Sequence, residues 1–357
     1  MTPNPADSRW EQRWHPLRRE WVVIAAHRDD RPWSGQREVA VDERPPTHAP
    51  ACHLCPGNTR VSGAVNDAYT GVYVFDNDHP CVGPGAPVDL VQPGGPYAAS
   101  PATGLSRVVC YHRRHDLRLA QLDHAGVVRL LATWQEQYRE LGSRPEVNHV
   151  LIFENNGPQV GVSNPHPHCQ IYATTFVFPT IEREAAACAA HHERTGRSLL
   201  GDMIDAELAD GRRILAARPG AVSFVPYCAR YACETYVAPR RAVASVAELH
   251  AAELDDLAAA LKDTLTRYDN LWSMPLPYVM ALHQAPTDGR DDAGFHFHIE
   301  LHPPLRRPNL LKFLAGPEIG AGGFIADTWP EDKAAELRAV AGDVHYLDAA
   351  MSEASDA

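Results

Sequence analysis

The sequence lacks any uninterrupted apolar run of about 18 residues or more, the length that a membrane-spanning helix needs. Its N-terminal segment also lacks the apolar core of a secretory signal and instead carries charged side chains at Arg9, Glu11, Arg13 and Arg18. We therefore expect a soluble, cytoplasmic protein.

Positive charge is scarce as well. The chain has 33 lysines and arginines against 45 aspartates and glutamates, for a net charge of −12. Binding to nucleic acid without regard to sequence depends on neutralising phosphates with basic side chains, so this partner class is disfavoured. A phosphate-bearing ligand must instead be bound by a few local arginines and by backbone N–H groups. The length of 357 residues and the ordinary globular composition suit two domains.

The cysteines also lack the regular spacing along the sequence that is typical of a disulfide framework. Of eight cysteines, only Cys52 and Cys55 show a recognisable spacing. In a chain of this size without a secretory signal, Cys-x-x-Cys is more often a metal-binding or redox pair than a disulfide. We expect most of the other cysteines to be buried as small hydrophobic residues.

The most informative segment present is His166-Pro167-His168-Cys169-Gln170, which is followed by a β-prone run. Side chains alternate along a strand, so His166, His168 and Gln170 should leave on one face. Pro167 cannot donate a ladder hydrogen bond, which places it at a sheet edge or a strand start. The pattern indicates an imidazole nucleophile, while a metal pair or a packed histidine turn is the alternative.

A polar loop interrupted by glycines precedes this motif. It runs over 155–163 and includes Asn155, Gly161 and Ser163. Glycines leave backbone N–H groups accessible, and these groups together with a hydroxyl can hold phosphate oxygens. The loop and the motif therefore predict a nucleophile that faces an anion site.

The chain repeats one pattern of helix, strand and His-x-His. The first copy has a helix over about 123–142, with Asp123 as its N-cap, and a strand over 149–153. The second copy has a helix that opens at Ser245 and stops near Pro275, and a strand over 278–282. The second copy ends in His296-x-His298-x-Glu300, so it carries a carboxylate where the first carries Gln170. This duplication predicts two related half-units, one catalytic and one structural.

The spacing His166-x-His168-x-Gln170 resembles the nucleotidyltransferase branch of the histidine triad superfamily, in which glutamine replaces the last histidine. Within that branch the chain is similar to the galactose-1-phosphate uridylyltransferase family, over about residues 28–318. The resemblance implies an α+β fold of two tandem histidine-triad-like half-units, each an antiparallel sheet with packed helices. We expect the domains to cover 1–178 and 179–357.

The resemblance implies a ping-pong uridylyl transfer between UDP-glucose and galactose 1-phosphate in galactose metabolism. His168 would carry the covalent uridylyl group, Gln170 would donate its amide to a phosphoryl oxygen, and Ser163 would hold a phosphate. Active sites of the family are built across a dimer, so we expect a homodimer.

Two metal sites are implied in the same way. Structural zinc would be held by Cys52, Cys55, His115 and His166, with a thiol pair that binds no ion as the alternative. Iron or a second zinc would be held by Glu184, His283, His296 and His298. Glu182 competes with Glu184 for the carboxylate position, and a hydrogen-bonded histidine core is the alternative to this second site.

The resemblance further implies which residues contact the substrates. These are Arg28 and Arg31 at the phosphates, Asn155 and Gly161 in the polar loop, Asn77 and Asp78 at the nucleoside, and Lys312, Phe313 and Glu318 at the hexose. An Asx turn is the alternative for the Asn-Asp pair. Pro317 and Phe324 depart from the family pattern and leave the hexose open.

Two other functions remain open from the sequence. An ADP-sugar or dinucleoside-polyphosphate phosphorylase of the same branch would keep the motif and transfer AMP, and an assay with UDP-glucose against ADP-glucose separates the two. From a different class, the chain would be a metal-stabilised binding protein with a vestigial site. Absence of any covalent nucleotide adduct would identify that class.

Overall fold

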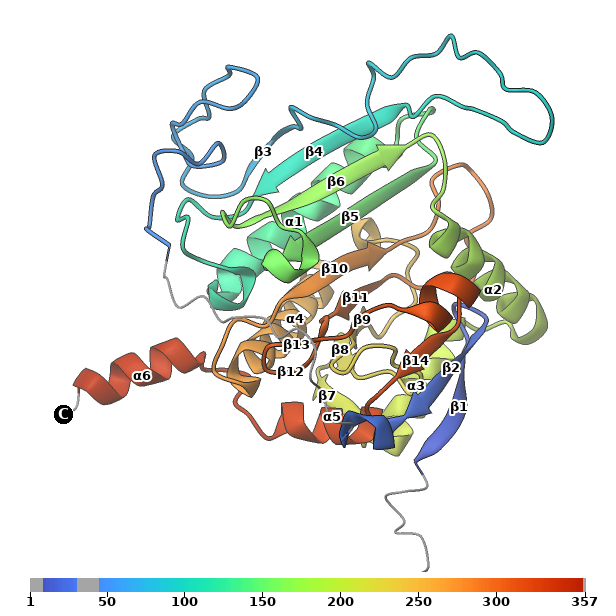
Figure 1. Ribbon diagram of the computed structural model, residues 1–357, viewed down its shortest axis with the longest axis vertical. Helices are drawn as coiled ribbons and strands as arrows, with labels where there is room; N and C mark the ends of the chain where they lie inside the picture. The colour runs from blue at the N-terminus through green and yellow to red at the C-terminus, as the bar shows by residue number, and fades with distance from the viewer. Residues whose placement is uncertain (1–8, 31–44, 356–357) are drawn as a thin grey trace, which may run out of the picture.

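The computed structural model describes residues 9–30 and 45–355, and it is built around one large antiparallel sheet (Figure 1). Its nine strands lie in the order β3-β4-β6-β5-β10-β11-β9-β8-β7. The strands are β3 Tyr73–Asp76, β4 Gly104–Cys110, β5 His149–Asn156, β6 His168–Thr174, β7 Ile214–Ala217, β8 Ala221–Phe224, β9 Thr235–Pro239, β10 Tyr278–His283 and β11 His298–His302. Arg31 lies outside the described residues.

The two predicted half-units meet edge to edge within this sheet. Strands β3 to β6 form one half, strands β7 to β11 form the other, and β5 pairs with β10 at the junction. Phe153 of β5 lies opposite Gln170 on one side and opposite Ala281 on the other, and Ala281 lies opposite Glu300. The prediction of two tandem antiparallel half-units is confirmed, and the structure adds that their sheets are continuous. The limit between 178 and 179 stays a prediction.

Two long helices pack side by side on one face of the sheet: α1 His124–Gly142 and α4 Ala251–Leu271. The first begins as predicted, because the Asp123 side chain accepts a hydrogen bond from the backbone N–H of Gly126 at 2.7 Å. The second begins later than predicted. Glu248 closes the short helix η5 Val246–Glu248 instead, and Glu253 accepts from the backbone N–H of His250 at 2.9 Å to start α4.

The opposite face of the second half is covered by a small three-stranded sheet and by helices. The small sheet contains β1 Trp10–His15, β2 Glu20–Ala25 and β14 Phe324–Ala326, and the hairpin of β12 Leu305–Arg307 and β13 Leu310–Leu311 lies near it. The remaining helices are η2 Ala26–Asp30, η3 Leu119–Gln121, η4 Pro158–Val160, α2 Pro179–Thr195, α3 Leu199–Asp210, η6 Gly316–Gly320, α5 Pro330–Arg338 and α6 Tyr346–Ser355.

The N-terminal hairpin docks directly on the second half, because His15 Nε2 lies 3.1 Å from the Tyr236 hydroxyl of β9. Among the described helices, none combines the length and the apolar character required to cross a membrane.

Candidate active site

His168 opens β6 in the middle of the large sheet, between β4 and β5, and lies opposite Cys110. Pro167 therefore stands at a strand start, as its missing N–H predicts. Its carbonyl oxygen accepts a hydrogen bond from the backbone N–H of Tyr111 at 3.2 Å. This bond joins the segment before His168 to the end of β4.

The hydrogen bonding of His168 assigns its tautomer. Nδ1 lies 2.7 Å from the carbonyl oxygen of His166, which can only accept, so Nδ1 carries the proton. The other ring nitrogen, Nε2, then carries the lone pair. Burial lowers the pKa of His168, which keeps the ring neutral. A neutral imidazole with an available lone pair is the form that attacks phosphorus.

Gln170 lies two residues along the same strand and is half-buried between Val108 of β4 and Phe153 of β5. The Tyr172 hydroxyl lies 3.4 Å from the amide oxygen of Gln170 and donates to it. With the oxygen engaged, the amide N–H₂ group is left to donate to a ligand. This orientation suits an acceptor with negative charge, such as a phosphoryl oxygen.

The loop before the motif turns tightly at two glycines. Gly157 and Gly161 have φ angles of 99° and 79°, which disfavour any side chain. At Gly157 an added Cβ would lie 2.7 Å from Cβ of Pro277, so the close approach of these segments also requires glycine.

Asn155 and Ser163 flank the loop. Continuing the β5–β6 register two residues beyond Phe153 and Gln170 places Asn155 opposite His168. Ser163 is exposed. The fold thus brings Asn155 beside His168 and leaves the Ser163 hydroxyl accessible to a ligand.

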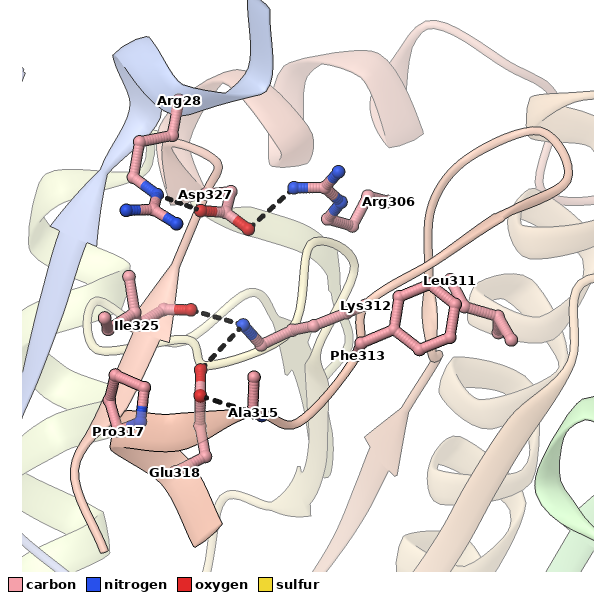
Figure 2. Close-up of a pocket in the computed structure, with 10 residues that line it drawn as sticks. All are labelled: Arg28, Arg306, Leu311, Lys312, Phe313, Ala315, Pro317, Glu318, Ile325 and Asp327. Atoms are coloured by element: carbon pink, nitrogen blue, oxygen red, sulfur yellow. Dashed lines mark hydrogen bonds and ion pairs between the residues drawn. The ribbon is translucent and has the colours of Figure 1, made fainter. Parts of the chain in front are cut away.

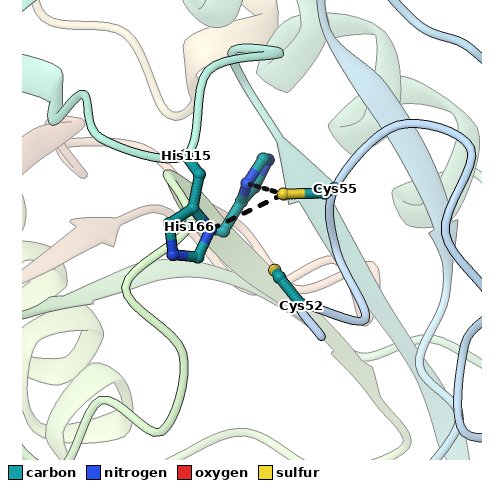
Figure 3. A group of neighbouring side chains, drawn as sticks. All are labelled: Cys52, Cys55, His115 and His166. Carbon is teal, nitrogen blue, oxygen red and sulfur yellow. Dashed lines mark hydrogen bonds between the residues drawn. The ribbon is translucent and has the colours of Figure 1, made fainter. Parts of the chain in front are cut away.

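Cys52, Cys55, His115 and His166 form a compact buried group next to this site (Figure 3). Their ligand atoms all lie within 4.8 Å of one another. Cys55 Sγ lies 3.6 Å from Nδ1 of both His115 and His166. A tetrahedral zinc ion separates a thiolate sulfur from an imidazole nitrogen by roughly 3.5 Å, which follows from bond lengths of about 2.3 and 2.0 Å. The spacing of the four side chains therefore fits a tetrahedral ion.

The tautomer of His166 fits a metal ligand as well. Its Nε2 lies 2.7 Å from the Tyr69 hydroxyl, which itself donates to the carbonyl oxygen of Leu54 at 2.5 Å. Nε2 must then donate, and the lone pair lies on Nδ1, which faces Cys55. Burial, followed by the neighbouring imidazoles, lowers the pKa of His166 to about 3. A neutral ring fixed by an outer hydrogen bond is the usual state of a metal-binding histidine.

A second buried group contains Glu184, His283, His298 and Glu300. The structure brings together three of the four predicted ligands and corrects the fourth. His296 is turned away, with Nε2 at 2.8 Å from the Pro239 carbonyl oxygen and Nδ1 at 3.1 Å from the Ser198 hydroxyl. It precedes β11 and does not share the alternation of side chains along that strand.

The choice between the two glutamates on α2 is also decided. Glu184 is buried, and its Oε2 lies 2.7 Å from His283 Nδ1, whereas Glu182 pairs with Arg290 on the surface. Residues two apart on a helix point in very different directions, so only one of them can face the sheet.

Glu300 and Arg18 belong to this second group although the sequence did not predict them there. Arg18 Nη2 lies 2.5 Å from Glu300 Oε2, and His283 Nε2 lies 3.3 Å from the same oxygen. Burial by itself would lower the pKa of His283, but Glu184 and Glu300 raise it above its ordinary value. The match of Glu300 to Gln170 was visible in the sequence, whereas nothing local marked Arg18.

A pocket of about 270 Å³ lies beside β14 and η6 (Figure 2). Four of the residues that line it are predicted to contact the substrates: Arg28, Lys312, Phe313 and Glu318. Lys312 Nζ lies 3.3 Å from Glu318 Oε1, so the ammonium group and the carboxylate are paired. The lining contains no residue of the 155–170 segment, and within one chain this pocket is separate from His168.

The same pocket contains two polar residues that sequence reasoning missed. Asp327 joins Arg28 and Arg306, at 3.0 Å from Arg28 Nε and 2.7 Å from Arg306 Nη1. Both lie outside any recognisable motif, and only the fold places them beside Arg28.

Asn77 and Asp78 follow β3. Asn77 Oδ1 accepts from the backbone N–H of His79 at 2.9 Å, which is an Asx turn. Asp78 lies 3.6 Å from Arg60, whose guanidinium stacks over the Phe75 ring at 4.3 Å. Phe75 lies opposite Val108, which in turn lies opposite Gln170. The pair is therefore held near the His168 site, and its contact with a nucleoside stays a prediction.

Comparison with known proteins identifies the family to which the chain belongs. Residues 2–178 match the model of the N-terminal domain of galactose-1-phosphate uridyl transferase, and residues 183–350 match the model of its C-terminal domain. Galactose-1-phosphate uridylyltransferase of Haemophilus influenzae is 37% identical over 338 residues, which cover 94% of this chain and 96% of that protein.

Two solved structures share the fold. A uridylyltransferase superposes with a TM-score of 0.74 at 29% identity, over 92% of this chain and 97% of that one. An ADP-glucose phosphorylase of Arabidopsis thaliana reaches the same TM-score of 0.74 at 21% identity, over 93% of this chain and 99% of that one, which shows the shared fold alone. From the family models and the sequence identity, the chain belongs to the galactose-1-phosphate uridylyltransferase family.

Proposed function

We propose that this protein transfers a uridylyl group from UDP-glucose to galactose 1-phosphate through His168. The observation that carries the proposal is the 2.7 Å hydrogen bond from His168 Nδ1 to the His166 carbonyl oxygen, because it puts the proton on Nδ1 and leaves the lone pair on Nε2. Membership of the family supports the choice of uridylyl donor and hexose acceptor.

In the first step Nε2 of His168 attacks the α-phosphorus of UDP-glucose. A phosphorus–nitrogen bond forms, the bond from that phosphorus to the bridging oxygen breaks, and glucose 1-phosphate leaves. In the second step a phosphate oxygen of galactose 1-phosphate attacks the same phosphorus and His168 leaves as neutral imidazole. Throughout, the amide of Gln170 donates to a phosphoryl oxygen, with Ser163 and the loop N–H groups beside it.

We also propose that Cys52, Cys55, His115 and His166 hold a zinc ion. Such an ion supplies no chemistry to the transfer and acts as a brace. It fixes His166, whose carbonyl oxygen accepts from His168 Nδ1, so the orientation of the nucleophile depends on the position of its neighbour. We propose as well that Glu184, His283, His298 and Glu300 can hold a second ion, with Glu300 in the place that the sequence assigned to His296.

A homodimer completes the proposal. Because the pocket with Arg28 and Lys312 is separate from His168 in one chain, we propose that it faces His168 of a second copy and binds the sugar phosphate there. Chains with His168→Gly and chains with Lys312→Ala should each have low activity. Mixed in equal amounts during refolding or co-expression, they should recover about a quarter of the parent activity, since half of the dimers regain one intact site. No recovery would place the whole site within one chain.

Intact-mass measurement tests the central proposal. Protein mixed with UDP-glucose alone should gain the mass of one uridylyl group, which is UMP less one water, on His168, and galactose 1-phosphate should remove it. ADP-glucose serves as the matched donor that separates uridylyl from adenylyl transfer. An adduct formed from ADP-glucose and not from UDP-glucose would reassign the protein to adenylyl transfer, and no adduct from either would reject the covalent mechanism.

A further inference from the structure

Glu154 is a buried acid on β5, the strand next to β6 and His168, and it takes no part in the mechanism above. It is 3% exposed and sits in β5 next to Asn155, with its side chain on the opposite face of the sheet, toward α1 and α4. The Tyr111 hydroxyl lies 2.7 Å from Glu154 Oε1, and the backbone N–H of Tyr111 donates to the Pro167 carbonyl oxygen at 3.2 Å. Two hydrogen bonds thus connect Glu154 to the peptide that precedes His168.

The surroundings of Glu154 offer no countercharge in direct contact. Tyr111 faces it from the end of β4, Tyr278 from β10 and Cys169 from β6. The guanidinium of Arg118, whose charge acts on Glu154, is itself paired with Asp269 of α4 at 2.7 Å. Within the described residues, Oε2 of Glu154 has no partner at hydrogen-bonding distance and angle, although the Tyr278 hydroxyl and the Asn156 amide lie close enough to oppose the effect of burial on its pKa.

These surroundings favour a neutral acid. A carboxylate buried without a countercharge costs several kcal/mol, and such a buried carboxyl group takes up a proton instead. Burial accordingly raises the pKa of Glu154 to about 7, against smaller opposing effects of Tyr111 and Arg118.

We propose that Glu154 is a positioning residue for the transfer reaction that acts in its protonated form, by holding Tyr111 and with it the Pro167 peptide that sets the place of His168. Loss of the proton leaves an uncompensated carboxylate under the catalytic strands and draws Tyr111 and water toward it. A displacement of His168 by about 1 Å lowers turnover on the order of a hundredfold. This inference rests on the proposed function, because turnover is its first readout.

The pH profile of Glu154→Gln tests the inference, since glutamine keeps the shape and stays neutral at every pH. The parent should lose kcat as the pH rises through about 7, where Glu154 ionises. Glu154→Gln should have the same kcat above pH 7 as below it. Its KM should equal that of the parent, because the side chain touches no substrate. A variant that loses kcat over the same pH range as the parent, or that is folded yet inactive at every pH, overturns the inference.

Tyr111→Phe provides a second variant in case Glu154→Gln does not fold. Removing the hydroxyl that donates to Glu154 destabilises the carboxylate, so the alkaline loss of kcat should move to higher pH while kcat itself falls. An unchanged midpoint contradicts the role of Glu154.

An infrared measurement separates this inference from the proposed function, because it needs no substrate. The C=O stretch of a protonated carboxylic acid should be present at about pH 6, absent from Glu154→Gln and lost from the parent at about pH 9. If the protein turns over UDP-glucose but lacks this band, the proposed function stands and only the protonated state of Glu154 is rejected. If the band is present but UDP-glucose is not turned over, Glu154 is a neutral acid, the proposed function is rejected, and Glu154 has no positioning role in that reaction.

Discussion

The two half-units place the same short motif in the same backbone geometry and use it differently. His168 Nδ1 lies 2.7 Å from the His166 carbonyl oxygen, and His298 Nδ1 lies 3.0 Å from the His296 carbonyl oxygen. Yet His168 is partly exposed, whereas His298 is 1% exposed. The strand alone therefore orients an imidazole, and the elements packed over it decide whether that imidazole meets a substrate.

The residue two positions further on shows why the second half is closed. The amide of Gln170 carries no charge and needs no buried partner, so it can remain directed toward a ligand. Glu300 is 0% exposed and carries a charge that must be compensated, and the N-terminal hairpin supplies Arg18 for this purpose. The carboxylate of Glu300, in the place of the Gln170 amide, therefore goes together with an N-terminal hairpin that covers this part of the second half.

The largest effect should come from deleting the nucleophile. We expect His168→Gly to lower uridylyl transfer on the order of a thousandfold or more, because no other side chain can form the covalent intermediate. Its thermal unfolding midpoint should stay close to that of the parent. The matched change His298→Gly should instead lower the midpoint and leave the activity per folded molecule largely intact. Loss of catalysis without loss of stability in His298→Gly would contradict the division of labour between the halves.

The next largest effect should follow from Cys52→Ala. We expect loss of bound zinc and a fall in activity on the order of a hundredfold, because an unbraced His166 no longer fixes the carbonyl group that orients His168. Elemental analysis of the purified protein, together with steady-state assays, provides the measurement. Cys110→Ala, which removes a buried thiol outside the cluster, is the control. A fully active parent that contains no zinc would refute the brace.

A stability effect should distinguish the second half. Glu300→Gln leaves Arg18 largely buried without its carboxylate, and removing one partner of a buried pair costs about 3 kcal/mol of unfolding free energy. Chemical denaturation at neutral pH measures this loss. The double change Arg18→Met with Glu300→Gln should recover part of it, because no charge is then left alone. Equal stability of Glu300→Gln and the parent would show that the pair contributes little.

The smallest and most specific effect concerns the ratio of two reactions. We expect Gln170→His to raise hydrolysis of UDP-glucose relative to transfer by several-fold, since an imidazolium can donate a proton to a leaving group and an amide cannot. Parallel assays with and without galactose 1-phosphate give the ratio. An unchanged ratio, or a parent that hydrolyses UDP-glucose freely, would show that Gln170 does not protect the intermediate.

Much of the catalytic half could be predicted because its signals are local. The alternation of side chains around Pro167 placed His168 and Gln170 on one strand face, and the Asp123 cap located the start of α1. The resemblance then linked Cys52, Cys55 and His115 to His166, and these four side chains do lie together.

The second half could be predicted less well because its site depends on contacts distant in the sequence. From the sequence His296 was expected as a ligand, and Glu300 lies in the group instead because β11 begins only at His298. Arg18 lies 282 residues before Glu300, so no local pattern could pair them.

The sequence by itself determined which residues can attack, donate and bind a metal, since spacing along a strand and the chemistry of each side chain are local properties. The tertiary structure decided which of these residues are accessible. It joined the two half-sheets at β5 and β10, laid the N-terminal hairpin over one half, and set the pocket with Lys312 apart from His168. Burial and the pairing of charges follow from packing between distant segments, which no local pattern specifies.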